Sequence, residues 1–184
     1  IGKKLSKQTE EFYDNNQVPL SRETSYVYDL ATTLNTETKV KSSAGDEIIE
    51  KNIYAFQFPT PTGHTGTDSQ VDALIRMKDT HNLSTPIEKQ TWRTKNGESK
   101  LIGSHLTKFR IEHDIVVPSE QYTLIATEPI ATYTPPIVVN SVFTFDNSRF
   151  LKLTSFLRFN EFGSLLEVSD VSGVTTSFIW GYNK

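Results

Sequence analysis

Short alternating stretches separated by turn clusters constrain the fold of this chain more than any other feature. In Thr36–Ser42, threonine and valine alternate with glutamate and lysine, and in Arg22–Asp29 the rings of Tyr26 and Tyr28 fall on one side. A side-chain period of two is typical of a strand, because successive side chains point to opposite faces. The turn clusters recur at roughly ten-residue spacing, which favours an all-β meander. We therefore predict a mainly β fold, an antiparallel hairpin meander with one short helix.

The clearest hairpin lies in the middle of the chain. The stretches Ile87–Lys95 and Glu98–Ile111 flank the dipeptide Asn96-Gly97. Asn-Gly is the preferred two-residue loop, since both positions of a type I′ turn need positive φ. We expect two long paired strands here.

One helix is expected after a loop that is rich in proline, glycine and threonine, residues 59–67. Asp68 or Ser69 can accept a hydrogen bond from a free amide of the first turn. The expected apolar stripe consists of Val71, Leu74, Ile75 and Lys78. We expect the helix to end near His81-Asn82 and to pack across a sheet or close its open end.

The pattern divides the chain into five segments of one larger structure. They are residues 1–58 with degenerate β-hairpin repeats, 59–84 with the loop and short helix, 85–113 with the Asn-Gly hairpin, 114–140 interrupted by Pro118, Pro129, Pro135 and Pro136, and 141–184 with the C-terminal hairpins. The run Ile137–Phe145 is expected to be a single strand. Because the first residue is Ile1 and no apolar leader follows it, we expect a piece of a longer protein.

Composition argues against several classes of protein. The chain has no cysteine, so disulfides, thiolate metal sites and cysteine nucleophiles are excluded. Its net charge is −3 without a block of like charge, which gives a nucleic-acid partner no support. No apolar run reaches the length of a membrane-spanning helix.

No grouping of residues predicts catalysis, a cofactor or a metal ion. The histidines are His64, His81, His105 and His113. None has the spacing of a zinc site, and we expect His64 to be solvated in its loop. The candidate calcium ligands are Asp14, Asp29, Asp146 and Asp170. They lack the spacing of an EF-hand loop, so turn capping is favoured for them. We expect that the chain is not an enzyme.

A weak internal repeat runs through the chain. An aromatic residue followed by Asp or Asn opens each copy, a turn glycine follows, and an aromatic residue closes it. The residues concerned are Tyr13, Asp14, Tyr28, Asp29, Gly45 and Tyr54 in the early copies, and Phe159, Asn160, Gly163, Leu165, Gly173, Trp180 and Tyr182 in the last. A single hairpin is marginally stable in water, so such units need neighbours.

This pattern resembles the YD-repeat, or RHS-repeat, family. The segment Phe159–Tyr182 is similar to the family motif, with Phe-Asn in place of Tyr-Asp, and its ending looks like the form found in large surface proteins of the Bacteroidetes. The copies at Tyr13 and Tyr28 lack the glycine after the opener. The resemblance implies a spiral β-sheet, which in this family can close into a shell around a toxic C-terminal region.

Two functional hypotheses follow. The first is a structural and interaction segment of a secreted or cell-surface protein, which contacts neighbouring repeats, another protein or secretion machinery. The alternative is a carbohydrate-binding or adhesin domain. Its candidate sugar-stacking residues are Tyr26, Tyr28, Trp92, Trp180 and Tyr182. Packing of these rings inside the sheet is the favoured explanation.

Overall fold

The computed structural model of the chain describes residues 4–13, 19–43 and 45–181. Its strands are β1 (Lys7–Tyr13), β2 (Pro19–Tyr28), β3 (Asn35–Ser42), β4 (Glu47–Tyr54), β5 (Pro86–Lys95), β6 (Glu98–Glu112), β7 (Ile115–Leu124), β8 (Ile137–Val139), β9 (Val142–Thr144), β10 (Phe150–Phe159), β11 (Leu165–Asp170) and β12 (Thr175–Ser177). The helix α1 spans Ser69–Asp79, and the 3₁₀ turns are η1 (Ala55–Gln57) and η2 (Asn147–Arg149).

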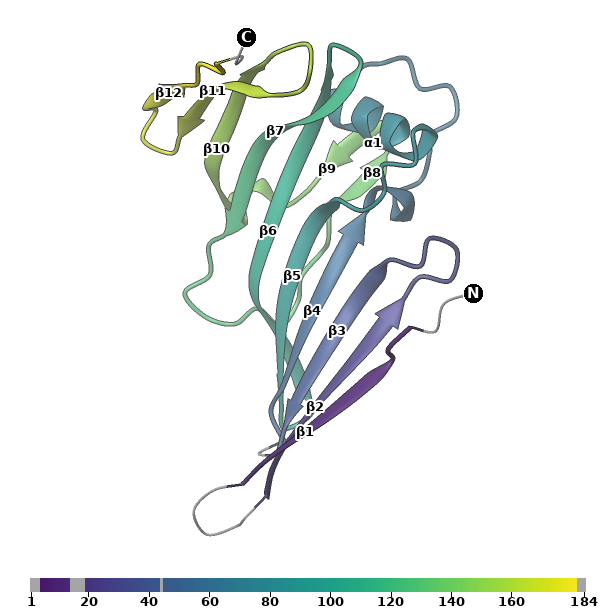
Figure 1. Cartoon of the computed structure of the whole chain (residues 1–184), viewed down its shortest axis with the longest axis vertical. Coiled ribbons are helices and arrows are strands. Elements are labelled where there is room, and N and C mark those ends of the chain that lie inside the picture. The colour runs from purple at the N-terminus through teal and green to yellow at the C-terminus, as the bar shows by residue number, and fades with distance from the viewer. Residues whose placement is uncertain (1–3, 14–18, 44, 182–184) are drawn as a thin grey trace. The chain divides into compact units, whose positions relative to one another are not determined.

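The predicted fold class is confirmed. Ten strands form one sheet in the order β1-β2-β3-β4-β5-β6-β7-β10-β11-β12, which follows the chain except for the separate pair β8-β9 (Figure 1). The neighbouring pairs whose register is defined are antiparallel. The chain forms two compact units, and each unit is built from three separate stretches of the sequence.

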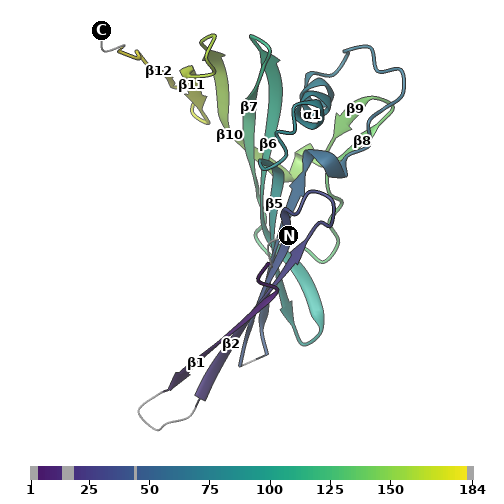
Figure 2. The same cartoon turned by 45° about the vertical axis from the view of Figure 1, so that its right-hand side comes forward.

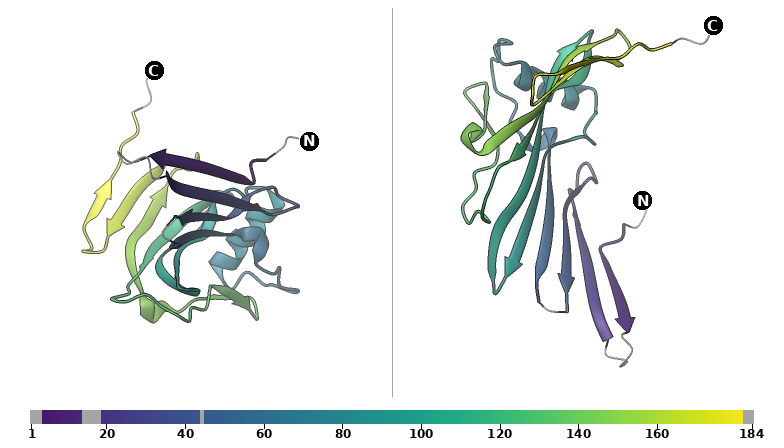
Figure 3. Two further views of the ribbon diagram at one scale, coloured as in Figure 1. Left: turned by 90° about the horizontal axis from the view of Figure 1, so that it is seen from below. Right: turned by 90° about the vertical axis from the view of Figure 1, so that its left-hand side faces the viewer.

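The first unit comprises residues 1–53, 88–104 and 126–133. In it β1, β2, β3 and β4 lie side by side as a meander (Figure 3). The stretch 126–133 joins β6 through a bridge between Leu101 and Ile130. No residue of β1, of 20–28 or of β3 is buried. These strands therefore form a single layer, whose stabilisation by burial is small.

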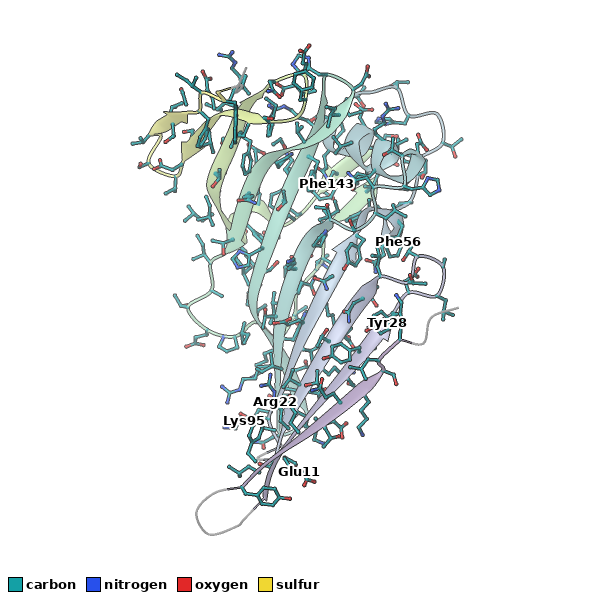
Figure 4. All side chains as sticks on the ribbon, in the orientation of Figure 1. Glu11, Arg22, Tyr28, Phe56, Lys95 and Phe143 are labelled. Carbon is teal, nitrogen blue, oxygen red and sulfur yellow. The ribbon has the colours of Figure 1, made fainter. Side chains whose placement is uncertain are left out.

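The second unit comprises residues 54–87, 105–125 and 134–184, and it holds most of the apolar core. Helix α1 packs against η1, β7 and β9 and lies beside the β8-β9 pair in Figure 2. Phe143, labelled in Figure 4, has its ring centroid 5.7 Å from that of Phe58. The ring centroid of Phe145 lies 5.2 Å from that of Tyr122 and 5.5 Å from that of Phe150. This aromatic cluster joins the helix layer to the sheet.

Helix α1 begins where the sequence predicts, but its buried stripe is rotated. Asp68 is the N-cap: its Oδ1 accepts from the amides of Gln70 and Val71 at 2.9 and 3.1 Å. The buried residues are Gln70, Val71, Ala73, Leu74 and Met77. The prediction was wrong for Ile75 and Lys78, which are partly exposed. The ammonium of Lys78 instead donates to the carbonyl of Phe58 at 3.0 Å.

The prediction that Pro118 interrupts the chain was wrong. Strand β7 runs through Pro118, which faces Phe109 where the β6-β7 register shifts between Lys108 and Phe109. Proline has no amide hydrogen and is tolerated in sheets at such bulges. The amide of Phe109 donates instead to Oε1 of the buried Gln70 in α1. The helix thus satisfies a backbone donor at the bulge.

Residues 137–145 form a hairpin and not the single strand predicted. Ile137–Val139 and Val142–Thr144 pair across a two-residue turn. Asn140 and Ser141 have φ of 49° and 62°, the signature of a type I′ turn. Serine rarely adopts positive φ, so the dipeptide Asn-Ser does not predict a type I′ turn, whereas Asn-Gly would.

Candidate interaction surfaces

The Asp and Asn residues that open the repeat act as turn formers. Asp29 Oδ1 accepts from the amide and the hydroxyl of Thr32 at 2.7 and 2.8 Å. The backbone bond from Thr32 is the main reason that the pKa of Asp29 lies below its ordinary value. Asn160 Oδ1 accepts from the amides of Phe162 and Ser164 at 3.0 and 2.8 Å. These side chains are occupied by local bonds. Asp14 lies outside the described residues.

The closing turn of the last copy is held in the same way. Asp170 Oδ1 accepts from the hydroxyl of Ser172 at 2.6 Å and from the amides of Ser172 and Val174 at 2.9 and 3.0 Å. The hydroxyl bond is the largest cause of a lowered pKa at Asp170. Gly173 has φ of 81° and donates its amide to the Asp170 carbonyl at 3.1 Å. The glycines Gly45, Gly97 and Gly163 also have positive φ, as does Asn96 at the β5-β6 turn.

The remaining residues of the motif have different environments in different copies. Tyr13 is 65% exposed, whereas Tyr54 and Phe159 are buried. In the last copy the described residues meet: Phe159 pairs with Leu165, and Trp180 Nε1 donates to the Leu165 carbonyl at 2.7 Å. Tyr182 lies outside the described residues. The structure therefore brings the described residues of the last copy together around Leu165.

Of the candidate sugar-stacking residues, Trp92 is half-buried. Its ring centroid lies 6.4 Å from that of Tyr133, and the ammonium of Lys51 stands 5.5 Å from it. Trp180 is 52% exposed and stacks on Phe178 at 6.4 Å. The rings of Tyr26 and Tyr28 are also stacked, with centroids 6.5 Å apart.

A buried carboxyl that the sequence analysis missed lies in the first unit. Glu88 is fully buried, and its Oε1 accepts from the hydroxyls of Ser104, at 2.5 Å, and Tyr133. Its Oε2 accepts from Gln90 Nε2 at 2.8 Å, and Gln90 Oε1 accepts from Trp92 Nε1 at 2.8 Å. The alternation Glu88, Gln90, Trp92 along one face of β5 is the only local signal of this network. Because buried polar groups need partners, the network ties residues 126–133 to the sheet.

The expectation that His64 is solvated was wrong. Its side chain is only 8% exposed, and Nε2 lies 2.7 Å from Oδ1 of Asp72 in α1. Nδ1 is buried without a partner among the described residues. The pair borders a hollow of about 570 Å³ whose lining includes Ser69, Arg76 and Asp79. Because His64 lies in the loop before α1 and Asp72 lies in α1, the pair anchors that loop to the helix. Within the described residues no group of three or more His, Asp and Glu is placed to hold a metal ion.

The two faces of the first unit's sheet differ in chemistry. One face, here called the charged face, carries ion pairs between Lys7 and Glu23 at 2.7 Å and from Glu37 to Lys39 and Lys51 at 3.2 and 3.7 Å. Ion pairs of this kind, within a strand or between neighbouring strands, suit a solvated surface. The opposite face carries the residues that alternate with these, and it is hollowed.

Three adjoining hollows form a trough on that opposite face. The first has a volume of about 330 Å³ and the middle one about 420 Å³, and both are lined by Arg22, Val40 and Ile48. The third, of about 370 Å³, shares Arg93 and Ile102 with the middle one. The trough thus crosses strands β1 to β6 within the first unit.

Comparison with known proteins does not identify the chain: no family model, no curated protein and no solved structure matches it. None of the helices in the described ranges combines the length and the apolar character needed to cross a membrane.

Proposed function

We propose that this chain is a structural and interaction segment of a larger secreted or cell-surface protein of the YD-repeat type. It would form part of a β-sheet wall and join neighbouring hairpin units through the edges of its sheet. The repeat-like ending Phe159–Tyr182 supports the family assignment and the location outside the cytoplasm. Encapsulation of a toxic region by such a wall belongs to the same proposal.

The free edges of the sheet carry this proposal. Among the described residues, β1 pairs only with β2, and β12 pairs only with β11. An unpaired edge presents a row of backbone donors and acceptors that templates pairing with another strand. Apolar residues accompany both edges: Phe12 is 54% exposed next to β2, and Ile179 after β12 is 99% exposed. A self-contained domain usually blunts such edges, so their exposure favours a chain that continues into further units.

Hydrogen exchange tests this proposal directly. The amide exchange of β1 and β12 would be measured in this chain and in a longer chain that includes the natural flanking sequence. We expect at least about tenfold slower exchange of both edge strands in the longer chain, because new ladder bonds protect their amides. The central strands β6 and β7 serve as the internal control. Equal exchange of the edges in both chains would reject the proposal, as would a gene without further hairpin units beside either edge.

A carbohydrate-binding function is the second candidate, and the exposed stack of Phe178 and Trp180 favours it. Aromatic faces can stack on the apolar side of a sugar ring. A glycan array tests it: saturable binding that Trp180→Ala abolishes and Trp92→Phe retains would support this function. Absence of binding by the wild-type chain would exclude it.

A further inference from the structure

The trough face of the first unit carries apolar side chains that a second layer could bury. Val40 and Ile48 are paired across β3 and β4, and Ile102 of β6 lines the same middle hollow. These apolar side chains are only partly buried, and Ile102 is 41% exposed. A single-layer sheet is stabilised when an apolar face packs on a second layer. On the charged face, Ile49 is buried opposite Lys39, and Trp92 already packs against Tyr133 of residues 126–133. On the trough side the apolar centre keeps exposed surface, so a further layer is expected there.

The two ends of the trough carry opposite charge. At the β1 end, the charged residues that belong to the first hollow alone are Glu10 and Glu50. At the β6 end, the charged residues that belong to the third hollow alone are Lys95, Glu98 and Lys100. The first set sums to −2 and the second to +1. The middle hollow between them contains Asp46, Arg93 and Arg22 with the apolar centre.

Several of these charges have no direct partner. Within the described part of the chain, the side chains of Arg22, Glu50 and Lys95 make no hydrogen bond or ion pair. By contrast, the guanidinium of Arg93 lies 2.5 Å from the carboxyl of Asp46. The hydrogen bond from Arg93 is the largest cause of the lowered pKa of Asp46, and the charge of Lys95 is the smallest. Figure 4 shows Arg22 and Lys95 toward the same end of the first unit. A net negative charge at one end, a net positive charge at the other and an apolar centre between them make this surface complementary to a second copy turned by 180°.

We propose that the trough is an isologous interface between two copies of this chain. A two-fold axis through the middle hollow would place the apolar centres against one another. It would also place the Glu50 end of each copy over the Lys95 end of its partner, so that every charged contact occurs twice. The interface would be a face-to-face packing of two sheets. It uses a face of the sheet and not its edges, so this proposal and the proposed wall function can fail independently.

Charge reversal and its rescue test the proposal. The concentration dependence of the molar mass would be measured by sedimentation equilibrium for the wild type, Glu50→Lys and Lys95→Glu. We expect a wild-type dimer, and we expect each variant to dimerise about a hundredfold more weakly, because each variant creates two like-charge contacts across the axis. An equimolar mixture of the two variants should regain the wild-type affinity, since both charged contacts of the mixed dimer then join a lysine of one variant to a glutamate of the other.

A matched control is Lys41→Glu, which makes the same change of charge as Lys95→Glu. Lys41 is an exposed residue of β3 on the charged face. It should dimerise like the wild type, and circular dichroism confirms that all the variants are folded. A monomeric wild type at every soluble concentration would overturn the proposal. So would single variants that dimerise normally, or a mixture that is no tighter than its components. Loss of binding to an acidic glycan by a monomeric Lys95→Glu variant would assign the trough to a saccharide instead.

Discussion

The substitution Glu88→Gln tests how the buried network of the first unit stabilises the protein. It keeps the size of the side chain and replaces one carboxylate oxygen with an amide NH2. In the wild type, Oε2 of Glu88 accepts from Gln90 Nε2, while Gln90 Oε1 accepts from Trp92 Nε1. An amide nitrogen at position 88 would face the amide nitrogen of Gln90. If Gln90 turned its amide over to relieve this contact, Trp92 would lose its acceptor.

The magnitude follows from the bonds that the variant cannot keep. A hydrogen bond to a charged group contributes about 1.5–3 kcal/mol, and a buried donor without a partner costs about 1–3 kcal/mol. The bonds from Ser104 and Tyr133 can persist on the remaining oxygen. We therefore expect Glu88→Gln to lower the free energy of unfolding by about 2–4 kcal/mol. For a chain of this length that corresponds to a fall in the melting temperature of roughly 5–15 °C.

Urea unfolding followed by tryptophan fluorescence measures this effect. The chain has two tryptophans. A Trp180→Phe background, common to all variants, makes Trp92 the single reporter beside the network. The double variant Glu88→Gln/Gln90→Glu is the matched control. It exchanges donor and acceptor, so that the new carboxylate can accept both from the new amide on its neighbour in the network and from Trp92. It should recover most of the loss.

Two results would refute this reasoning. The first is a change in unfolding free energy below about 0.5 kcal/mol for Glu88→Gln, which is the range of ordinary surface substitutions. The second is a double variant that is no more stable than the single one, because the loss would then not arise from the direction of the Glu88–Gln90 bond.

Three further predictions concern the second unit and the turns. Gln70→Met leaves the buried amide of Phe109 without its acceptor and should cost about 1–3 kcal/mol in a thermal melt, whereas an unchanged melting temperature would show that the bond contributes nothing. Gly97→Val forces a β-branched residue to φ of 81° and should destabilise the β5-β6 hairpin by about 1–2 kcal/mol in urea, while an equally stable variant would contradict the strain argument. The pKa of Asp170 is lowered in the folded protein. The stabilising contribution of this carboxylate is therefore present above the ordinary pKa of 3.8 and is lost as pH falls through the folded-state pKa. An NMR titration of this carboxyl should have its midpoint below 3.8, and a midpoint above that value would refute the assignment.

Features that depend on residues within about four positions of one another could be predicted from the sequence. Asn96-Gly97 forms a turn with both residues at positive φ, and Asp68 caps α1. The alternation in β3 separates the charged face from the trough. These elements are local because a turn, a cap or a pleat is determined by the backbone and its nearest side chains.

The site residues were predictable to a smaller extent. The repeat pattern located turn formers such as Asp29 and Asn160, whose bonds are local. It did not indicate the trough, because no single strand contains it. Neighbouring strands in register contribute one or two side chains each, and the sequence of one strand does not show which face remains uncovered.

What only the tertiary structure decided involves partners far apart in the chain. Glu88 is satisfied by Tyr133, which lies 45 residues later, and Gln70 satisfies Phe109, which lies 39 residues later. The sequence by itself determined the meander, the turns and the helix start, because those depend on short-range sterics and hydrogen bonding. The burial of Glu88 and His64 and the self-complementary trough depend on which distant strands and loops meet, and that depends on the packing of the whole chain.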